Sequence, residues 1–277
     1  MKKIILFIAV MSMAFTTAAK NGKFDGVSVI SYNIRFVTPK DGDNQWKYRA
    51  EASPAMIKDY APDVFGVQEA VFEQLEYLDK KLPKYSFVGV GREDGKRKGE
   101  TMAVFYNTKV VKLLDWGTYW LSETSEVPSK GWDAVCKRTA TWTLMEMKDS
   151  GKKFFFVNTH LDHRGETAQQ KGLELIVRKI AEMNPDGLPM ILTGDFNVEP
   201  ENPVLTGLNA RMSDARKTAV KTDSRATFNG WGSTALFIDY IYYSGFSECV
   251  EFETIVRQYK DVPYISDHYP IMSRLRF

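Results

Sequence analysis

The sequence predicts an α/β protein in which two mainly antiparallel β-sheets pack face to face, with helices on the outside. Short apolar segments of strand character are numerous, helical segments are few and amphipathic, and no internal repeat runs along the chain. A barrel of regularly alternating strands and helices would need such a repeat. Two packed sheets covered by helices accommodate many strands and few helices.

The composition supports a large folded unit. The 277 residues are 44% hydrophobic and 13% aromatic, which supplies a sizeable core and excludes an intrinsically disordered chain. No low-complexity tract and no convincing interdomain linker interrupts the sequence. We therefore expect one domain over residues 20–277.

Residues 1–19 have the pattern of a secretory signal peptide. Two lysines follow Met1, residues 4–15 are apolar, and small residues occupy positions 16–19. The apolar run is shorter than the roughly 20 residues that span a bilayer. We expect a signal peptide and a periplasmic or extracellular protein without a transmembrane segment; a tethering N-terminal helix is the alternative.

Charge and cysteine content narrow the functional classes. The formal net charge is +2, and residues 1–19 carry two lysines and no acid, so the mature chain is nearly neutral. A neutral chain lacks the positive field expected of a protein that binds long nucleic acids non-specifically. In an oxidising compartment, Cys136 and Cys249 either form a disulfide or remain buried thiols, and both alternatives stay open.

The local pattern predicts the elements in order. Residues 27–33 alternate apolar and polar side chains, as a half-buried strand does. A helix is expected to begin with Ser53 as N-cap and Pro54 as its first residue. Residues 72–82 place four apolar side chains on one helical face, and residues 169–183 form the longest predicted helix. Further strands are predicted over residues 62–69, 85–90, 101–106, 110–121, 138–147, 153–159, 190–193, 236–243, 250–256 and 271–275.

Polar residues follow the ends of successive predicted strands. Loops at strand ends carry chemistry on a rigid support. All three histidines of the chain fall in these segments. The residues concerned are Asn33, Gln68, Glu69, His160, Asp162, His163, Asp195, Asn197, Asp239, Asp267 and His268.

These residue types suit phosphoester hydrolysis, which requires neutralised phosphoryl charge, an activated water and a stabilised leaving oxygen. Glu69 is the best candidate ligand for Mg²⁺, because a hard cation prefers carboxylate oxygen. Asp267 can be a second ligand, and Asn33 can supply an amide oxygen.

Proton transfer and phosphoryl binding need residues other than these metal ligands. His268 can accept the proton of water if Asp239 holds its ring. Asp195 can orient or deprotonate the same water, and Asn197 and His160 can donate hydrogen bonds to the phosphoryl oxygens.

Six segments together resemble the endonuclease/exonuclease/phosphatase (DNase I-like) superfamily over about residues 25–277. They are Ser-Tyr-Asn33-Ile, Gln68-Glu69, Asn158-Thr-His160-Leu-Asp162, Gly194-Asp195-Phe-Asn197, Ile238-Asp239-Tyr-Ile and Ser266-Asp267-His268-Tyr-Pro270. The resemblance implies a four-layer α/β sandwich and a divalent-metal phosphoesterase.

The resemblance also implies roles for single residues. It assigns metal binding to Asn33, Glu69 and Asp267, and a His–Asp pair to His268 and Asp239. It places Asp195, Asn197 and His160 around the scissile phosphate. From weaker segment matches, Glu100 is expected to orient His160, and Arg138 to contact a phosphate.

We therefore expect an exported phosphoesterase that uses Mg²⁺ or Mn²⁺, acts as a monomer and prefers small phosphorylated or nucleotide-like substrates. A pocket built by the loops at residues 122–132 and 229–233 would suit such substrates, and Trp46, Trp120, Trp132 and Trp231 are candidate cleft walls. One alternative is a secreted nuclease whose cations at residues 92–98 follow the nucleic-acid backbone. Another is a non-catalytic binding module on the same fold.

Overall fold

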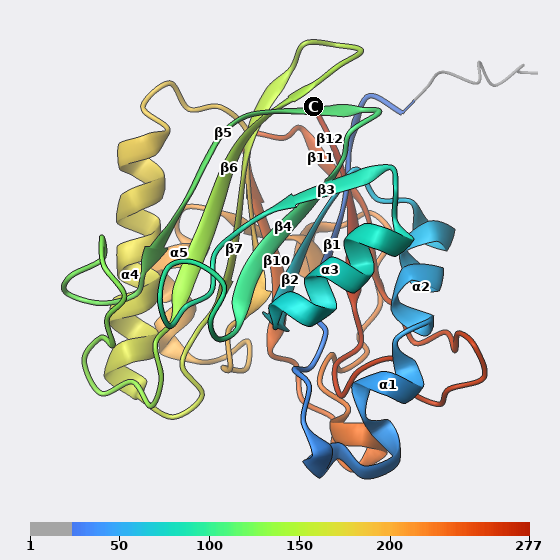
Figure 1. Cartoon of the computed structure of the whole chain (residues 1–277). Helices are drawn as coiled ribbons and strands as arrows, with labels where there is room; N and C mark the ends of the chain where they lie inside the picture. The colour runs from blue at the N-terminus through green and yellow to red at the C-terminus, as the bar shows by residue number, and fades with distance from the viewer. Residues whose placement is uncertain (1–23) are drawn as a thin grey trace, which may run out of the picture.

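Two six-stranded β-sheets pack face to face at the centre of the protein, and helices cover their outer faces (Figure 1). The computed structural model describes residues 24–277. The predicted four-layer α/β sandwich with two mainly antiparallel sheets is confirmed. The predicted signal peptide, residues 1–19, lies outside the described residues. Within residues 24–277, no helix is long and apolar enough to cross a membrane.

The first sheet has the strand order β11-β12-β1-β2-β4-β3. The neighbours β1 and β2 run parallel, with Asn33 opposite Gln68, and the other neighbours run antiparallel. The strands are β1 (Gly26–Asn33), β2 (Val64–Ala70), β3 (Tyr85–Val88), β4 (Thr101–Asn107), β11 (Glu248–Thr254) and β12 (Ile271–Arg276).

The second sheet has the order β5-β6-β7-β8-β10-β9 and repeats this arrangement. Its neighbours β7 and β8 run parallel, with His160 opposite Asp195, and the other neighbours run antiparallel. The strands are β5 (Val111–Trp120), β6 (Thr139–Met147), β7 (Lys153–His160), β8 (Met190–Asp195), β9 (Ser213–Asp214) and β10 (Asp239–Ser244).

A helix connects the strands of each parallel pair. In the chain, α2 (Ala52–Tyr60) lies between β1 and β2, and α4 (Glu166–Met183) lies between β7 and β8. Parallel neighbours need such a crossover, because their carboxyl ends lie at the same edge of the sheet. The polar residues at the carboxyl ends of these four strands therefore lie at the same end of each sheet. The two groups meet where Asn33 contacts Asp195.

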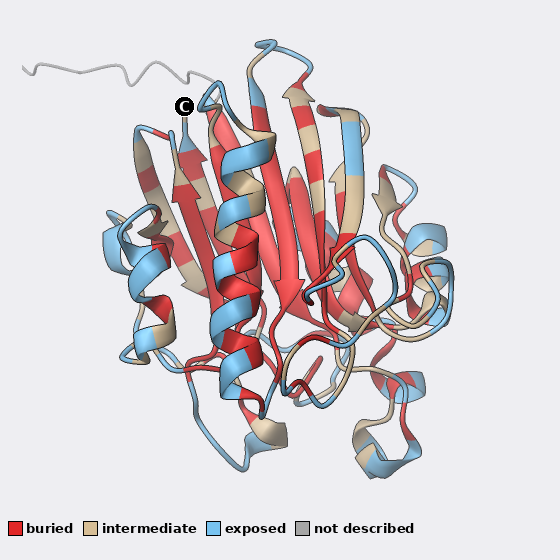
Figure 2. Ribbon diagram, turned by 90° about the vertical axis from the view of Figure 1, so that its left-hand side faces the viewer, coloured by how far each residue is buried: buried red, intermediate tan, exposed pale blue. Residues whose placement is uncertain are grey.

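The helices bury the apolar faces that the sequence predicts. Leu75 and Leu78 of α3 (Phe72–Lys81) pack in the core beside the first sheet, and Leu173 and Ile176 of α4 pack beside the second. Figure 2 shows the buried positions of α4 toward the sheet and its exposed positions toward solvent. Short helical segments complete the chain: η1 (Pro39–Asn44), α1 (Trp46–Arg49), η2 (Pro203–Leu205), α5 (Thr206–Asn209), α6 (Ala215–Thr218) and η3 (Gly230–Gly232).

The predicted start of the second helix is wrong. α2 begins at Ala52, and no side chain caps it. Ser53 is buried, and its hydroxyl lies 2.8 Å from the Tyr32 hydroxyl of β1. The Ser53 hydroxyl, which the local pattern predicted to cap the helix, thus contacts Tyr32 instead, a residue distant in the chain.

Arg49 is a buried cation, with 1% of its surface exposed, and it connects two loops near the carboxyl ends of β1 and β2. Among the described residues, its guanidinium donates hydrogen bonds to four backbone carbonyl oxygens: Asn44 at 2.9 Å, Ile34 at 2.6 Å, Ile265 at 3.0 Å and Arg35 at 2.9 Å. These carbonyls belong to the segment after β1 and to the segment before Asp267. One side chain therefore links segments more than two hundred residues apart, as the Arg49–Ile265 separation of 216 shows.

Replacing Arg49 by methionine is expected to lower the free energy of unfolding by about 3 kcal/mol, because two buried and two partly buried carbonyl groups lose their donor. Urea unfolding measures the change. The control is Arg257→Met, whose side chain is 63% exposed and pairs with Asp59; it should change stability by less than about 0.5 kcal/mol. Equal losses in the two variants would contradict this role for Arg49.

Candidate active site

A cavity of about 540 Å³ opens at the edge where the two parallel strand pairs end. Eight of the ten predicted site residues line it: Glu69, Glu100, Arg138, His160, Asp195, Asn197, Asp267 and His268. The other two, Asn33 and Asp239, lie behind the wall and form hydrogen bonds with lining residues. The structure thus brings all ten residues together.

Asp195, the last residue of β8, is the central residue of the cavity. Its Oδ2 atom lies 3.0 Å from Asn33 Nδ2, 3.4 Å from His160 Nε2 and 3.7 Å from His268 Nε2. Its Oδ1 atom accepts a hydrogen bond from the backbone N–H of Asn197 at 2.9 Å. One buried carboxylate therefore contacts groups from β1, β7 and the segment before β12.

His268 and Asp239 form a buried pair beside it. Nδ1 of His268 lies 2.8 Å from Oδ2 of Asp239, and the Phe228 ring packs against the imidazole with 4.8 Å between centroids. A carboxylate on Nδ1 fixes the tautomer and orientation of an imidazole. Nε2 of His268 is the ring atom left to face Asp195, so it is placed to accept a proton.

Burial and neighbouring charges shift the pKa values of this group. Burial raises the pKa of Asp195 to about 7, and the nearby Asp239 carboxylate adds to the rise. Burial lowers the pKa of His268, but Asp239 and Asp195 outweigh it and raise that pKa to about 10. In the metal-free protein the His268 ring is therefore protonated at neutral pH. A divalent cation bound by Glu69 and Asp267 would lower this pKa and free Nε2 of His268 to accept a proton.

The raised pKa of His268 makes the stability of the metal-free protein depend on pH. The protonated ring is favoured in the folded state, so its contribution is complete below the ordinary pKa of 6.5 and is lost as pH rises through about 10. Between pH 6.5 and 10, the wild type should lose a few kcal/mol more of unfolding free energy than His268→Gln. Denaturant unfolding in EDTA across this range measures the difference, and identical pH slopes would contradict it.

Glu69 and Asp267 supply the carboxylate oxygens that a hard divalent cation prefers. Both line the cavity, and the guanidinium of Arg35 lies 3.8 Å from Glu69 and 3.6 Å from Asp267. A cationic group thus already lies between them, and the donor set fits Mg²⁺ or Mn²⁺. Asn33 presents its amide nitrogen to Glu69, while its oxygen accepts from the Arg35 backbone. Its predicted role as an oxygen ligand would require the amide to turn over.

A second group of ligand types overlaps the proton-transfer residues. Atoms of Asp195, Asp239 and His268 lie within 4.8 Å of one another. Because Asp239 and His268 already bond each other, we assign this trio to proton transfer and the Glu69–Asp267 pair to the cation.

Unusual backbone conformations aim three residues at the cavity. Arg35, Glu69 and Asn197 have φ values of 59°, 61° and 55°, in the left-handed region that non-glycine residues seldom adopt. At Glu69, the register between β2 and β4 shifts between Val67 and Ala70. Such strain costs about 1–3 kcal/mol per residue and clusters at functional sites.

His160 and Glu100 do not form the hydrogen bond that the family resemblance implies. The Glu100 carboxylate accepts from Arg92 Nη1 at 2.7 Å, and burial raises the pKa of Glu100 to about 6. In the described structure, Nδ1 of His160 is buried and has no hydrogen-bond partner. Nε2 of His160 lies 3.0 Å from Asn197 Nδ2. Burial and the nearby Arg138 keep the pKa of His160 well below 6.5, so the ring is neutral.

Arg138 forms a second positive wall of the cavity. Its Nε donates to Asp162 at 3.3 Å, and its Nη2 lies 2.9 Å from His163 Nδ1. Cys136 lines the same wall as a free thiol, and Cys249 of β11 is also free. The two cysteines are not joined, so of the two alternatives the structure has thiols.

Several predicted lining segments lie elsewhere. None of the described residues of the loops at 122–132 and 229–233, and none of the four tryptophans, lines the cavity. Trp46 and Trp120 are buried instead, and the Trp120 indole donates to the Arg92 carbonyl oxygen at 2.8 Å. Sequence reasoning missed the lining residues Arg35, Phe36, Cys136 and Phe228. A signal existed only for Arg35, which is two residues after Asn33.

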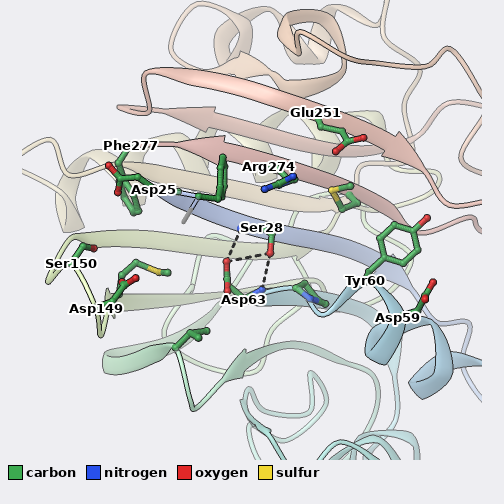
Figure 3. Close-up of a pocket in the computed structure, with 16 residues that line it drawn as sticks. Asp25, Ser28, Asp59, Tyr60, Asp63, Asp149, Ser150, Glu251, Arg274 and Phe277 are labelled. Atoms are coloured by element: carbon green, nitrogen blue, oxygen red, sulfur yellow. Dashed lines mark hydrogen bonds between the residues drawn. The ribbon is translucent and has the colours of Figure 1, made fainter. Parts of the chain in front are cut away.

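A separate hollow of about 490 Å³ lies at the opposite end of β1 (Figure 3). Its carboxylates include Asp25, Asp63 and Asp149, and the Asp63 carboxylate accepts from the backbone and hydroxyl of Ser28 at 2.8 and 3.2 Å. This contact fastens β1 to the start of β2. The hollow lacks histidine, and none of the predicted site residues lines it.

Comparison with known proteins shows the family to which the chain is similar. The sequence model of the Endonuclease/Exonuclease/phosphatase family matches residues 30–268. The structure of an endonuclease/exonuclease/phosphatase from Bacteroides vulgatus is 37% identical in sequence and superposes with a TM-score of 0.85. The match covers 91% of this chain and 98% of the Bacteroides vulgatus chain. A mannosyl-6-phosphatase of Bacteroides thetaiotaomicron is 34% identical with a TM-score of 0.86, covering 91% of this chain and all of its own.

More distant matches include a probable RNA exonuclease and nocturnin. A probable RNA exonuclease of Saccharomyces cerevisiae is 26% identical over 67% of this chain, and the chain spans 40% of its length. The catalytic domain of human nocturnin is 20% identical with a TM-score of 0.72, covering 91% of this chain and 94% of its own, which shows the shared fold.

Proposed function

Because the chain belongs to the endonuclease/exonuclease/phosphatase family, we propose that it is a divalent-metal-dependent phosphoesterase acting on small phosphorylated molecules. The observation that carries the proposal is the contact of Asp195 with Asn33, His160 and His268 in one buried cluster. This cluster shares its cavity with the carboxylates of Glu69 and Asp267.

The residues divide into three tasks. His268, oriented by Asp239, accepts the proton of the attacking water, and Asp195 orients the same water. Asn197 and His160 donate hydrogen bonds to the phosphoryl oxygens as charge builds there. Glu69 and Asp267 would hold Mg²⁺ or Mn²⁺, which would supply positive charge to neutralise the phosphoryl oxygens and the leaving oxygen.

The substrate that we propose first is a phosphorylated sugar or a nucleotide-like molecule. A 34% identical relative is named a mannosyl-6-phosphatase. The cavity of about 540 Å³ matches a small ligand. Phe36 and Phe228 on its wall offer apolar faces to the non-phosphate part, and Arg138 offers a cation to the phosphate.

A nuclease is the second candidate, favoured by the yeast relative named a probable RNA exonuclease. Two of the four cations at residues 92–98 give it limited support, because Arg92 pairs with Glu100 and Arg97 pairs with Glu76. Paired cations attract a nucleic-acid backbone less than free ones.

A substrate panel tests the proposal. Sugar phosphates, inositol phosphates, NADP, sphingomyelin, RNA and plasmid DNA are incubated with Mg²⁺ and the wild type, Glu69→Ala or His268→Ala. Release of phosphate from small monoesters by the wild type, with loss in both variants, is the expected result. Efficient cleavage of RNA or DNA with no action on small esters would favour the nuclease, and no hydrolysis of any ester would favour a binding module.

We further propose that the protein is exported and acts as a monomer. The composition of residues 1–19 supports export. Cell fractionation followed by N-terminal sequencing tests export: protein outside the cytoplasm that begins near residue 20 is expected, and protein found only in the cytoplasm with Met1 retained would contradict it. Light scattering tests the monomer.

A further inference from the structure

The side chain of Arg35 occupies an unusual position in the cavity. Its guanidinium lies between the Glu69 and Asp267 carboxylates, at 3.8 and 3.6 Å. It also donates two hydrogen bonds to Asp41, from Nε at 3.1 Å and from Nη2 at 3.0 Å. Its carbon atom lies 4.7 Å from the centre of the Phe36 ring. One cation is therefore shared by three carboxylates, two of which we assign to the metal.

The backbone of Arg35 is fixed in place. Its φ of 59° is in the left-handed region. Its N–H donates to Asn33 Oδ1 at 3.0 Å, and its carbonyl oxygen accepts from Arg49 Nη2 at 2.9 Å and from Gln74 Nε2 at 2.8 Å. Arg35 is thus held from β1, α1 and α3, rather than lying freely on the surface.

The positive charge of Arg35 affects how Glu69 and Asp267 can bind a cation. Two carboxylates beside each other in a partly buried site repel, and a shared cation offsets that repulsion. A divalent cation bound by the same carboxylates would itself be repelled by the guanidinium. The bidentate contact with Asp41, whose side chain is 4% exposed, keeps the guanidinium near the site.

We propose that Arg35 is a built-in counter-ion of the metal site, which competes with the divalent cation for Glu69 and Asp267 and so sets the metal affinity. The inference rests on the proposed function, because it takes these two carboxylates as the cation ligands. Arg35 is then a positioning residue, which acts on the metal through its charge.

Replacing the charge while keeping most of the side-chain volume tests the proposal. Arg35→Gln should bind Mn²⁺ about tenfold more tightly than the wild type, because a unit positive charge a few ångströms from a divalent ion is worth at least this much. Arg35→Lys keeps the charge and should stay close to wild-type affinity. Titration calorimetry and the electron paramagnetic resonance signal of free Mn²⁺ measure affinity without any substrate.

The control is Arg257→Gln, an exposed cation paired with Asp59 outside the cavity, which should leave Mn²⁺ affinity unchanged. Unchanged or weaker binding in Arg35→Gln, with Arg35→Lys equal to it, would overturn the proposal. If Arg35→Gln does not fold, a gain in affinity for Arg35→Lys as large as tenfold would overturn it as well, and wild-type affinity would support it. A wild type that binds no Mn²⁺ would instead overturn the metal assignment of the proposed function.

Discussion

Replacing His268 by glutamine is expected to lower kcat for phosphoester hydrolysis by about 10³-fold, within the range that general acid–base catalysis contributes. Glutamine keeps a polar side chain of similar size, but it cannot accept a proton from water. The expected loss follows from the position of Nε2, which faces Asp195 while Asp239 holds Nδ1. Steady-state kinetics with a phosphomonoester measures the change.

Asp239→Asn is the matched comparison for this variant. It leaves the ring of His268 in place but removes the charge on Nδ1, so kcat should fall while KM stays near the wild-type value. Because Asp239 also raises the pKa of His268, the pH at which the variant is most active should move to a lower value. If His268→Gln retains more than about a tenth of wild-type kcat, another group must accept the proton.

Replacing Glu69 by glutamine is expected to reduce kcat/KM by 10² to 10³-fold and to weaken Mn²⁺ binding, because the site loses one of its two assigned carboxylate ligands. The side chain is otherwise well supported, since Asn33 Nδ2 and the Phe36 N–H each donate to it at 3.3 Å. The amide nitrogen of glutamine would face these donors and the cation unfavourably. Activity over a series of Mn²⁺ concentrations separates weaker binding from slower chemistry.

Glu248→Gln provides the control, because that carboxylate pairs with Arg276 on the surface of the first sheet. It should leave both Mn²⁺ binding and hydrolysis unchanged. Wild-type Mn²⁺ affinity in Glu69→Gln would remove Glu69 from the ligand set.

Most of the fold could be predicted from local sequence patterns, and the site from those patterns together with the family resemblance. The strand β1 was predicted within one residue, and all ten predicted site residues line or support one cavity. Asn33, Glu69, His160 and Asp195 lie at the carboxyl ends of the two parallel pairs, which bring these ends together. Asp239 instead begins β10, and Asp267 and His268 precede β12, so the fold and not the strand-end pattern places them. The roles assigned to these residues stay predictions until the variants are measured.

Contacts between distant segments could not be predicted. The helix α4 begins at Glu166, three residues before the predicted start, because the Asp133 carboxylate accepts from the backbone N–H groups of Thr167 and Ala168. Glu100 was expected to orient His160, but Arg92 takes its carboxylate. In each case, packing between distant segments decides which group forms the hydrogen bond, and hydrophobic periodicity carries no information about such packing.

The position of Arg35 is the clearest example of a contact that the sequence could not predict. Its sequence context, two residues after Asn33, marks it as a loop residue. Only the fold shows that its left-handed backbone carries the guanidinium between Glu69 and Asp267, with Asp41 on its other side. No local pattern encodes the meeting of four such groups.

Hydrolysis of a phosphomonoester by the wild type, before and after removal of divalent cations with EDTA, tests the cation-dependent site most directly. Activity should fall to background in EDTA and return when Mg²⁺ or Mn²⁺ is added in excess, whereas Glu69→Gln should regain little under the same conditions. Hydrolysis that continues undiminished in EDTA, in both the wild type and Glu69→Gln, would contradict a reaction that depends on a cation held by Glu69 and Asp267.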